Sequence, residues 1–218
     1  MDEAAGATVA RDSSTLHNDG KLEVADPATS WIPGKFGSAL QFNDNDKNYG
    51  VRVEATARID GLTRYTVAAW VRRLRVRPGA YMSIISRQLG TGIGEVFDMS
   101  VSNDLLQAYA PDRSNDGVSA AAAKATAPVN QWFHAAATYD GNTLRVYQDG
   151  IEQGSVTWTK GLPSTTTPLY LGTNKNSAGA SDVHHPWEGL IDELLLYDVA
   201  LSPASIAALA SGTRPPAP

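Results

Sequence analysis

One stretch decides the fold: Gln131-Trp132-Phe133-His134-Ala135-Ala136-Ala137-Thr138-Tyr139-Asp140-Gly141-Asn142-Thr143-Leu144-Arg145-Val146-Tyr147-Gln148-Asp149-Gly150. It contains two Asp-Gly pairs, and each follows a run of residues that favours β-strands. Glycine accepts the positive φ angle that a tight hairpin turn requires, so both pairs predict turns. The segment 131–154 is therefore predicted to form three strands of an antiparallel meander.

The middle strand of this meander alternates in polarity, because successive side chains of a strand point to opposite faces. Leu144 and Val146 are predicted to face a core, whereas Thr143, Arg145 and Tyr147 are predicted to face outward. This pattern is typical of an antiparallel sheet that is buried on one side. The stretch indicates an all-β protein with two packed sheets.

Other segments extend this prediction along the chain. Segment 120–125 is rich in alanine, but it lacks a helix cap and lies between strands, so we expect a strand there. Ser202-Pro203 is typical of a helix start, and Gly212 of its end. The expected fold is an all-β, two-sheet antiparallel jelly-roll sandwich with one short C-terminal helix. We expect residues 1–212 to form one domain and residues 213–218 to begin a Pro-rich linker or tail. Further strands are expected at 21–24, 38–42, 49–53, 65–74, 81–87, 96–101, 105–109, 155–159, 168–172 and 187–197.

Composition excludes several classes of function. The net charge of -5 argues against nucleic acid as a partner. No apolar run approaches the roughly 20 residues that span a bilayer. With no cysteine, the chain has neither disulfides nor thiol chemistry. The four arginines between 72 and 77 crowd a strand end, and we interpret them as a solvated edge rather than an anion site.

Several short motifs follow one another in a familiar order. Together they resemble the laminin-G-like, concanavalin A-like jelly-roll domains that occur as accessory modules of bacterial secreted proteins and glycosidases. The resemblance covers residues 9–209. It implies two antiparallel sheets, frequently one structural calcium, and often a glycan- or protein-binding surface, but not catalysis by itself. The motifs are Gly34-Lys35-Phe36-Gly37-Ser38-Ala39-Leu40-Gln41-Phe42, Tyr65-Thr66-Val67-Ala68-Ala69-Trp70-Val71, Trp132-Phe133-His134, Val146-Tyr147-Gln148-Asp149-Gly150, Leu169-Tyr170-Leu171-Gly172 and Gly189-Leu190-Ile191-Asp192-Glu193.

The resemblance implies a Ca²⁺ ion that joins the first polar loop to the last strand. Asp12 and Asp192 would supply carboxylates, and His17 and Asn18 would supply loop oxygens. Calcium takes about six to eight such ligands. Taken without the resemblance, Asp12 and Asn18 could make only turn hydrogen bonds, and Asp192 could pair with an arginine. A second oxygen-rich loop spans residues 43–46, and scattered histidines without cysteine argue against structural zinc.

The acidic residues of the last strand do not have the spacing that glycoside hydrolysis needs. Asp192 and Glu193 are neighbours and would point to opposite faces, and Glu188 is four residues from Asp192. No Gly-x-Ser-x-Gly motif is present, and His134 is expected to be a packed core residue. We therefore expect no catalytic activity.

A ligand surface is predicted on loops that carry aromatic and planar polar groups. The predicted ligand-binding residues are Tyr109, Arg113, Asn174 and His184, with Arg87 and Gln88 nearby. Trp70, Trp132 and Trp187 are assigned to the core.

These observations lead to one main hypothesis and two alternatives. The chain is expected to be a non-catalytic carbohydrate-binding accessory module, monomeric, secreted, and joined to neighbouring domains of a longer bacterial protein. Its partner would be a glycan or polysaccharide. The alternatives are a protein-binding adhesion or spacer module, and a glycan-active enzyme.

Overall fold

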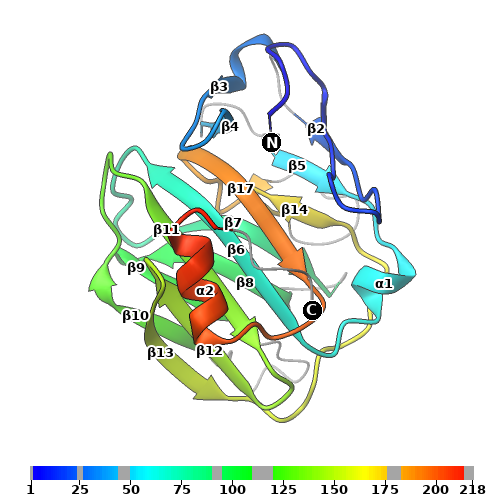
Figure 1. The fold of residues 1–218 in the computed structure, drawn as a ribbon, viewed down its shortest axis with the longest axis vertical. Coiled ribbons are helices and arrows are strands. Elements are labelled where there is room, and N and C mark those ends of the chain that lie inside the picture. Colours follow the sequence, from blue (N-terminus) through cyan, green and yellow to red (C-terminus); the bar gives the residue numbers. More distant parts are fainter. Residues whose placement is uncertain are drawn as a thin grey trace.

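The computed structural model describes residues 2–23, 27–43, 50–89, 95–109, 120–175 and 183–213. Two antiparallel sheets pack face to face, which confirms the predicted jelly-roll sandwich (Figure 1). The eight-stranded sheet has the order β1 (Val9–Ala10), β2 (Gly20–Glu23), β5 (Gly50–Val53), β14 (Leu169–Leu171), β7 (Tyr81–Gln88), β8 (Glu95–Ser102), β9 (Leu105–Tyr109) and β10 (Ala120–Thr126).

The second sheet has seven strands, and a small ribbon of two further strands follows β14. The seven-stranded order is β13 (Ile151–Thr157), β12 (Thr143–Gln148), β11 (Phe133–Tyr139), β6 (Tyr65–Arg73), β17 (Gly189–Tyr197), β4 (Ser38–Phe42) and β3 (Trp31–Pro33). The ribbon pairs β15 (Asn174–Lys175) with β16 (Val183–His184). The helical elements are the 3₁₀ turn η1 (Pro27–Thr29) and the helices α1 (Ala57–Asp60) and α2 (Pro203–Ala210).

The predicted meander is present as β11, β12 and β13. At the second turn Asp149 and Gly150 both have positive φ angles, 52° and 80°, as a two-residue hairpin turn requires. At the first turn the Asp140 carboxylate accepts hydrogen bonds from the backbone amides of Asn142 and Thr143, at 2.9 and 2.7 Å. Leu144 and Val146 face the core, as predicted.

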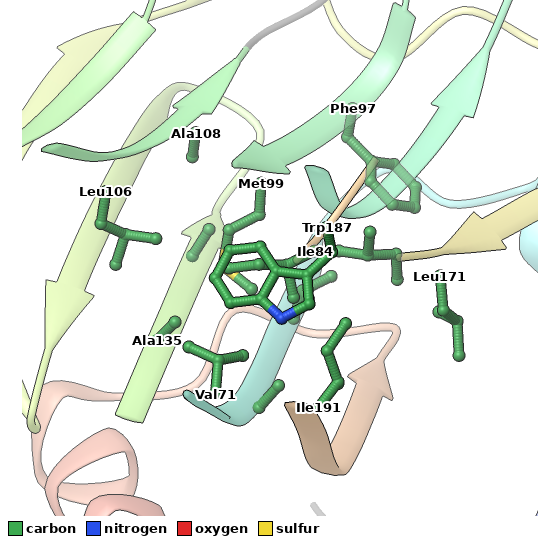
Figure 2. Close-up of a cluster of buried hydrophobic side chains, with 14 of the residues drawn as sticks. Val71, Ile84, Phe97, Met99, Leu106, Ala108, Ala135, Leu171, Trp187 and Ile191 are labelled. Atoms are coloured by element: carbon green, nitrogen blue, oxygen red, sulfur yellow. The ribbon is translucent and has the colours of Figure 1, made fainter. Parts of the chain in front are cut away.

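The core lies between the two sheets and is centred on Trp187 (Figure 2). Its indole is fully buried and is surrounded by side chains from both sheets, and its Nε1 donates to the Leu190 carbonyl at 3.3 Å. The assignment of Trp187 to the core is thus confirmed. Trp70 and Trp132 were assigned wrongly, because both are only half-buried and lie outside the core cluster.

Helix α2 covers the outer face of the seven-stranded sheet (Figure 1). Ser202 caps its first turn by accepting a hydrogen bond from the Ser205 amide at 3.2 Å, and Pro203 is the first helical residue. Ile206 and Leu209 pack against Tyr147. Tyr147 does point away from the core, as predicted, but the helix buries it from solvent.

Two further expectations can be compared with the structure. The alanine-rich segment forms strand β10, as predicted. The interpretation of the arginine run as a solvated edge is wrong for Arg73, which is buried and binds Asp104 and the carbonyl oxygen of Pro128. In the part of the chain that the structure describes, no helix is long and apolar enough to span a bilayer.

Candidate functional site

The outer face of the eight-stranded sheet carries two carboxylates on one strand, β8. Phe97, Met99 and Val101 of this strand belong to the core, so Asp98 points to the outer face. Glu95 would point inward under strict alternation. A β-bulge changes this, because Arg87 pairs with Phe97 and Gln88 pairs with Glu95, which leaves one extra residue in β8.

The bulge lets two consecutive residues, Val96 and Phe97, both enter the core. Glu95 and Asp98 therefore share the outer face although they are three positions apart. A similar register shift in β7 places Ile84 and Ile85 in the core.

Hydrogen bonds join these carboxylates to neighbouring strands. Ser83 Oγ donates to Asp98 Oδ2 at 2.7 Å. Asn174 Nδ2 donates to Glu95 Oε1, and Gln88 Nε2 donates to Asn174 Oδ1. We call Ser83, Gln88, Glu95, Asp98 and Asn174 the polar cluster. It joins β7, β8 and β15 on one face of the molecule.

The two carboxylates are held in an environment that disfavours their charge. Burial raises the pKa of Asp98 well above its ordinary value, the charge of Glu95 raises it further, and the hydrogen bond from Ser83 opposes the rise. Burial also raises the pKa of Glu95, against hydrogen bonds from Asn174 and Gln88. Among the described residues, neither carboxylate forms an ion pair with a lysine, arginine or histidine. Strongly shifted carboxyl groups of this kind are typical of functional sites.

Asn174 reaches the polar cluster because the chain turns sharply after β14. Gly172 has a φ angle of 72°, and a Cβ atom added there would lie 2.3 Å from the Phe42 ring. Only glycine fits this position. The Asn174 side chain that follows is 2% exposed.

Aromatic rings lie beside the polar cluster. The Tyr81 and Tyr109 rings meet edge to face with centroids 6.0 Å apart, and Tyr81 and His185 lie 5.0 Å apart. Tyr109 pairs with Asp98 in the β8–β9 register. Burial raises the pKa of the Tyr109 hydroxyl, as do the contact with Tyr81 and the charges of Asp98 and Glu95. We call Tyr81, Tyr109 and His185 the aromatic platform. Tyr81 is 38% exposed, so part of the platform is open to solvent.

The predicted ligand-binding residues compare with this site as follows. Tyr109 and Asn174 belong to it. Arg113 lies outside the described residues. The backbone of His184 pairs with that of Asn174 in the β15–β16 ribbon. Arg87 is a structural residue, buried against the carbonyl oxygens of Ile59 and Thr165.

Sequence reasoning missed Glu95, Asp98 and Tyr81. The only signal for the acidic pair was its odd spacing in Glu95-Val96-Phe97-Asp98, and without the bulge that spacing places the two carboxylates on opposite faces. Tyr81 was predicted only as the start of a strand.

The residues predicted to bind calcium lie in two separate segments. Asp12 accepts hydrogen bonds from the amides of Ser14 and Asn18, each at 2.8 Å, and His17 lies near enough to act on its charge. Burial opposes ionisation of Asp12, but these hydrogen bonds outweigh it and lower the pKa. The loop lies between β1 and β2, at the edge of the eight-stranded sheet.

Asp192 lies in β17 of the other sheet. Its Oδ2 accepts from the Phe36 amide at 2.9 Å, and its Oδ1 accepts from the Glu193 amide at 2.8 Å. Burial raises its pKa, although these hydrogen bonds oppose the rise. Asp192 therefore fixes the turn that precedes β4, and in these contacts it shares no partner with Asp12. The hydrogen bonds of Asp12 and Asp192 do not bring these residues together as the calcium ligands that the resemblance implies. Among the described residues, no group of three or more acidic or histidine side chains could hold a metal.

The acidic residues that were weighed for catalysis are occupied by other contacts. The Glu188 side chain is buried and pairs with Arg75 and with Arg77, the latter at 3.1 Å. Asp192 is engaged by backbone amides, as described above. His134 is buried, as predicted, with its ring 5.5 Å from that of Trp70. Burial lowers the His134 pKa to about 4, so the imidazole is neutral at neutral pH.

The sequence also matches a known protein family. A family model described as the concanavalin A-like lectin/glucanases superfamily matches residues 44–207. The chain belongs to this superfamily. The resemblance derived from the motifs is thereby confirmed. A search of curated proteins finds no match.

Solved structures share the fold at low sequence identity. The binding domain of Paraclostridial Mosquitocidal Protein 1 has a TM-score of 0.71 at 14% identity, and the alignment covers 93% of this chain and 49% of that one. Domain 4 of AbnA, a GH43 extracellular arabinanase from Geobacillus stearothermophilus, was solved in complex with arabinotriose. It has a TM-score of 0.60 at 22% identity, with coverage of 83% and 80%.

A Trypanosoma rangeli sialidase has a TM-score of 0.65 at 17% identity, and the alignment covers 96% of this chain and 31% of that one. The chain thus spans about half of the mosquitocidal binding domain and less of the sialidase. At these identities the comparisons establish the shared fold.

Proposed function

We propose that this protein is a non-catalytic carbohydrate-binding module, and that it binds glycans on the outer face of the eight-stranded sheet. The observation that carries the proposal is the meeting of the aromatic platform with the polar cluster. Aromatic rings can pack against the apolar faces of sugar rings, and carboxylates and carboxamides accept and donate hydrogen bonds to hydroxyl groups. The platform supplies the first kind of contact and the cluster the second.

Three features of the site support binding over hydrolysis. Asp98 is only 3% exposed, and hydrogen bonds from Ser83 and Asn174 tie up the cluster. Glu188 and Asp192 are engaged by arginines and backbone amides. A hydrolase needs an acid and a base or nucleophile that both reach the scissile bond. The proposal therefore assigns no acid or base role to these carboxylates, and assigns glycan recognition to the partly exposed Tyr81, Tyr109 and Glu95.

The neighbours in fold support a role as an accessory module of a secreted protein. One is a domain of an extracellular arabinanase, solved with arabinotriose. Another is the binding domain of Paraclostridial Mosquitocidal Protein 1, and this chain spans about half of it. We propose the same arrangement here, with neighbouring domains in one longer secreted chain.

Protein binding is a second candidate function, favoured by exposed apolar side chains in the segment that precedes Tyr81. Leu74 and Val76 are 37% and 43% exposed. They lie in the segment between β6 and β7, which leads directly to Tyr81. An adhesion module would use such side chains to contact a protein partner.

A glycan array followed by titration calorimetry of the best oligosaccharide tests the proposal. Tyr81→Ala should weaken binding about tenfold or more, because stacking aromatics dominate such contacts. Ile151→Ala is the matched control, since Ile151 is 66% exposed and lies in β13 of the other sheet. Absence of any glycan signal, or equal binding by Tyr81→Ala, would count against carbohydrate recognition and favour the protein-binding candidate.

A further inference from the structure

Two carboxylates, the half-buried Glu95 and the buried Asp98, lie together on the outer face of β8. They interact with each other, and Asn174 hydrogen-bonds Glu95. No lysine, arginine or histidine among the described residues pairs with either one. Like charges held close in a poorly solvated environment repel, and burial removes the water that would screen them. Within the described ranges of the chain, the two carboxylates therefore have no counter-charge.

A second, independent observation comes from Gln88. Its side chain is 2% exposed, and its Nε2 contacts Glu95 and Asn174, so the carboxamide lies within the polar cluster. Its carbonyl oxygen, Oε1, is buried and has no hydrogen-bond partner among the described residues. A buried polar atom without a partner costs free energy, so it needs an explanation such as a bound ion or water.

These groups match the ligand preferences of one class of ion. Calcium binds carboxylate and amide oxygens in irregular arrangements, and water completes its shell of six to eight ligands. Magnesium demands a more regular octahedron and keeps most of its own water, and zinc prefers nitrogen and sulfur ligands. A set of two carboxylates and one amide oxygen, with no histidine among the ligands, favours calcium.

We propose that Glu95, Asp98 and the Oε1 atom of Gln88 bind a Ca²⁺ ion. The bulge at Val96 is what brings the two carboxylates to one face, so the site is a product of the fold rather than of a sequence motif. It is separate from the calcium predicted at Asp12 and Asp192. It does not depend on glycan binding, and its test uses no glycan.

The proposal predicts opposite orders of melting temperature for the calcium-free and the calcium-bound protein. Without calcium, the pair Glu95→Gln and Asp98→Asn removes repulsion, so the double variant should be at least as stable as the wild type. With calcium, only the wild type gains stability, because a ligand that binds the folded state alone stabilises it by mass action. The order of the melting temperatures should therefore reverse.

The experiment uses the full chain after removal of metals with a chelator. Calorimetric titration with CaCl₂ should show one site per chain in the wild type. The double variant should lose about 100-fold or more in affinity, because calcium affinity follows the charge of its ligands. Gln88→Ala, which removes one neutral ligand, should lose about tenfold. Asp12→Asn is the control, and it should bind as the wild type does.

Each other outcome overturns the proposal. Wild-type protein that takes up no calcium and shows no melting shift at millimolar CaCl₂ would exclude the site. Equal calcium affinity in the double variant would place the ion elsewhere. Loss of binding in Asp12→Asn would assign the ion to the loop between β1 and β2. Melting curves in chelator establish that the variants are folded before any titration is interpreted.

Discussion

Glu95 and Asp98 lie on the same face of β8, although residues three positions apart point to opposite faces of a regular strand. Val96 and Phe97 both enter the core, and this single irregularity creates the polar cluster. The outer face thereby gains two adjacent carboxylates, next to an open aromatic platform. A local feature of the backbone thus determines where the groups of the proposed glycan site lie.

Gly172 should be far less tolerant of substitution than Gly79. Both have a φ angle of 72°, but an added Cβ at Gly79 meets nothing within 4 Å, whereas at Gly172 it would meet Phe42 at 2.3 Å. Gly79→Ala should cost about 1 kcal/mol from backbone strain alone. Gly172→Ala should cost about 3 kcal/mol, since it adds a clash in a packed core. Urea unfolding of the two variants measures the difference, and equal costs would show that Phe42 can move aside.

Asp192→Ala should destabilise the protein by about 3 kcal/mol, because it leaves the buried acceptor position for the Phe36 and Glu193 amides empty. Asp192→Asn should cost less, since its carbonyl oxygen can still accept one of these bonds. Asp12→Ala provides the comparison. Because Asp12 lies in an exposed loop, this change should lower the free energy of unfolding by less than about 1 kcal/mol. Denaturant titration in chelator checks all three. A cost for Asp192→Ala no greater than that for Asp12→Ala would contradict the assigned role.

Acid should destabilise the protein partly through His134. Its pKa is lowered to about 4 in the folded protein by burial, whereas the unfolded chain takes up the proton near the ordinary value of 6.5. Below pH 6.5 the unfolded state therefore binds more protons, and the folded state loses stability as the pH falls toward 4. The full effect on the free energy of unfolding is about 3 to 4 kcal/mol, because each pKa unit corresponds to about 1.4 kcal/mol.

The measurement is the free energy of unfolding at several pH values between 7 and 4, for the wild type and for His134→Gln. The difference in the free energy of unfolding between the two proteins should change as the pH falls from about 6.5 to about 4, and should level off below pH 4. Parallel curves would show that His134 is solvated or charged in the folded state.

Ser202→Ala should destabilise the protein by about 1 kcal/mol, because the first turn of α2 loses its capping oxygen. The same change at Ser211, beyond the last turn, removes a hydrogen bond to the Ala208 carbonyl in an exposed position and should cost less. Thermal unfolding of both variants checks the prediction. Equal shifts for the two variants would indicate that the cap contributes nothing specific.

Much of the fold could be predicted from local chemistry. The two Asp-Gly turns fix the meander, and alternation around Leu144 and Val146 fixes which face is buried. Ser202-Pro203 marks the start of α2. What α2 covers could not be predicted, because its contact with Tyr147 joins residues about 60 positions apart and depends on how the sheet curves. Trp70 was misplaced because an aromatic side chain of a strand can lie on either face of the sheet. Trp132 precedes β11 instead of lying in a strand.

The candidate site was predicted only in part. Tyr109 and Asn174 were predicted as ligand-binding residues, and the structure places both at the candidate site. Glu95 and Asp98 were not, since a β-bulge leaves no residue pattern that sets it apart from regular alternation. The contact between Asp192 and Phe36 spans 156 positions and replaces the arginine partner that was considered for Asp192.

The most direct test of the account is amide chemical-shift mapping of the labelled protein during titration with the oligosaccharide that scores best on a glycan array. The account predicts saturable shifts at the aromatic platform and the polar cluster, above all at Tyr81, Tyr109 and Asn174. Shifts confined to α2 and the seven-stranded sheet, or no saturable shift at all, would contradict it.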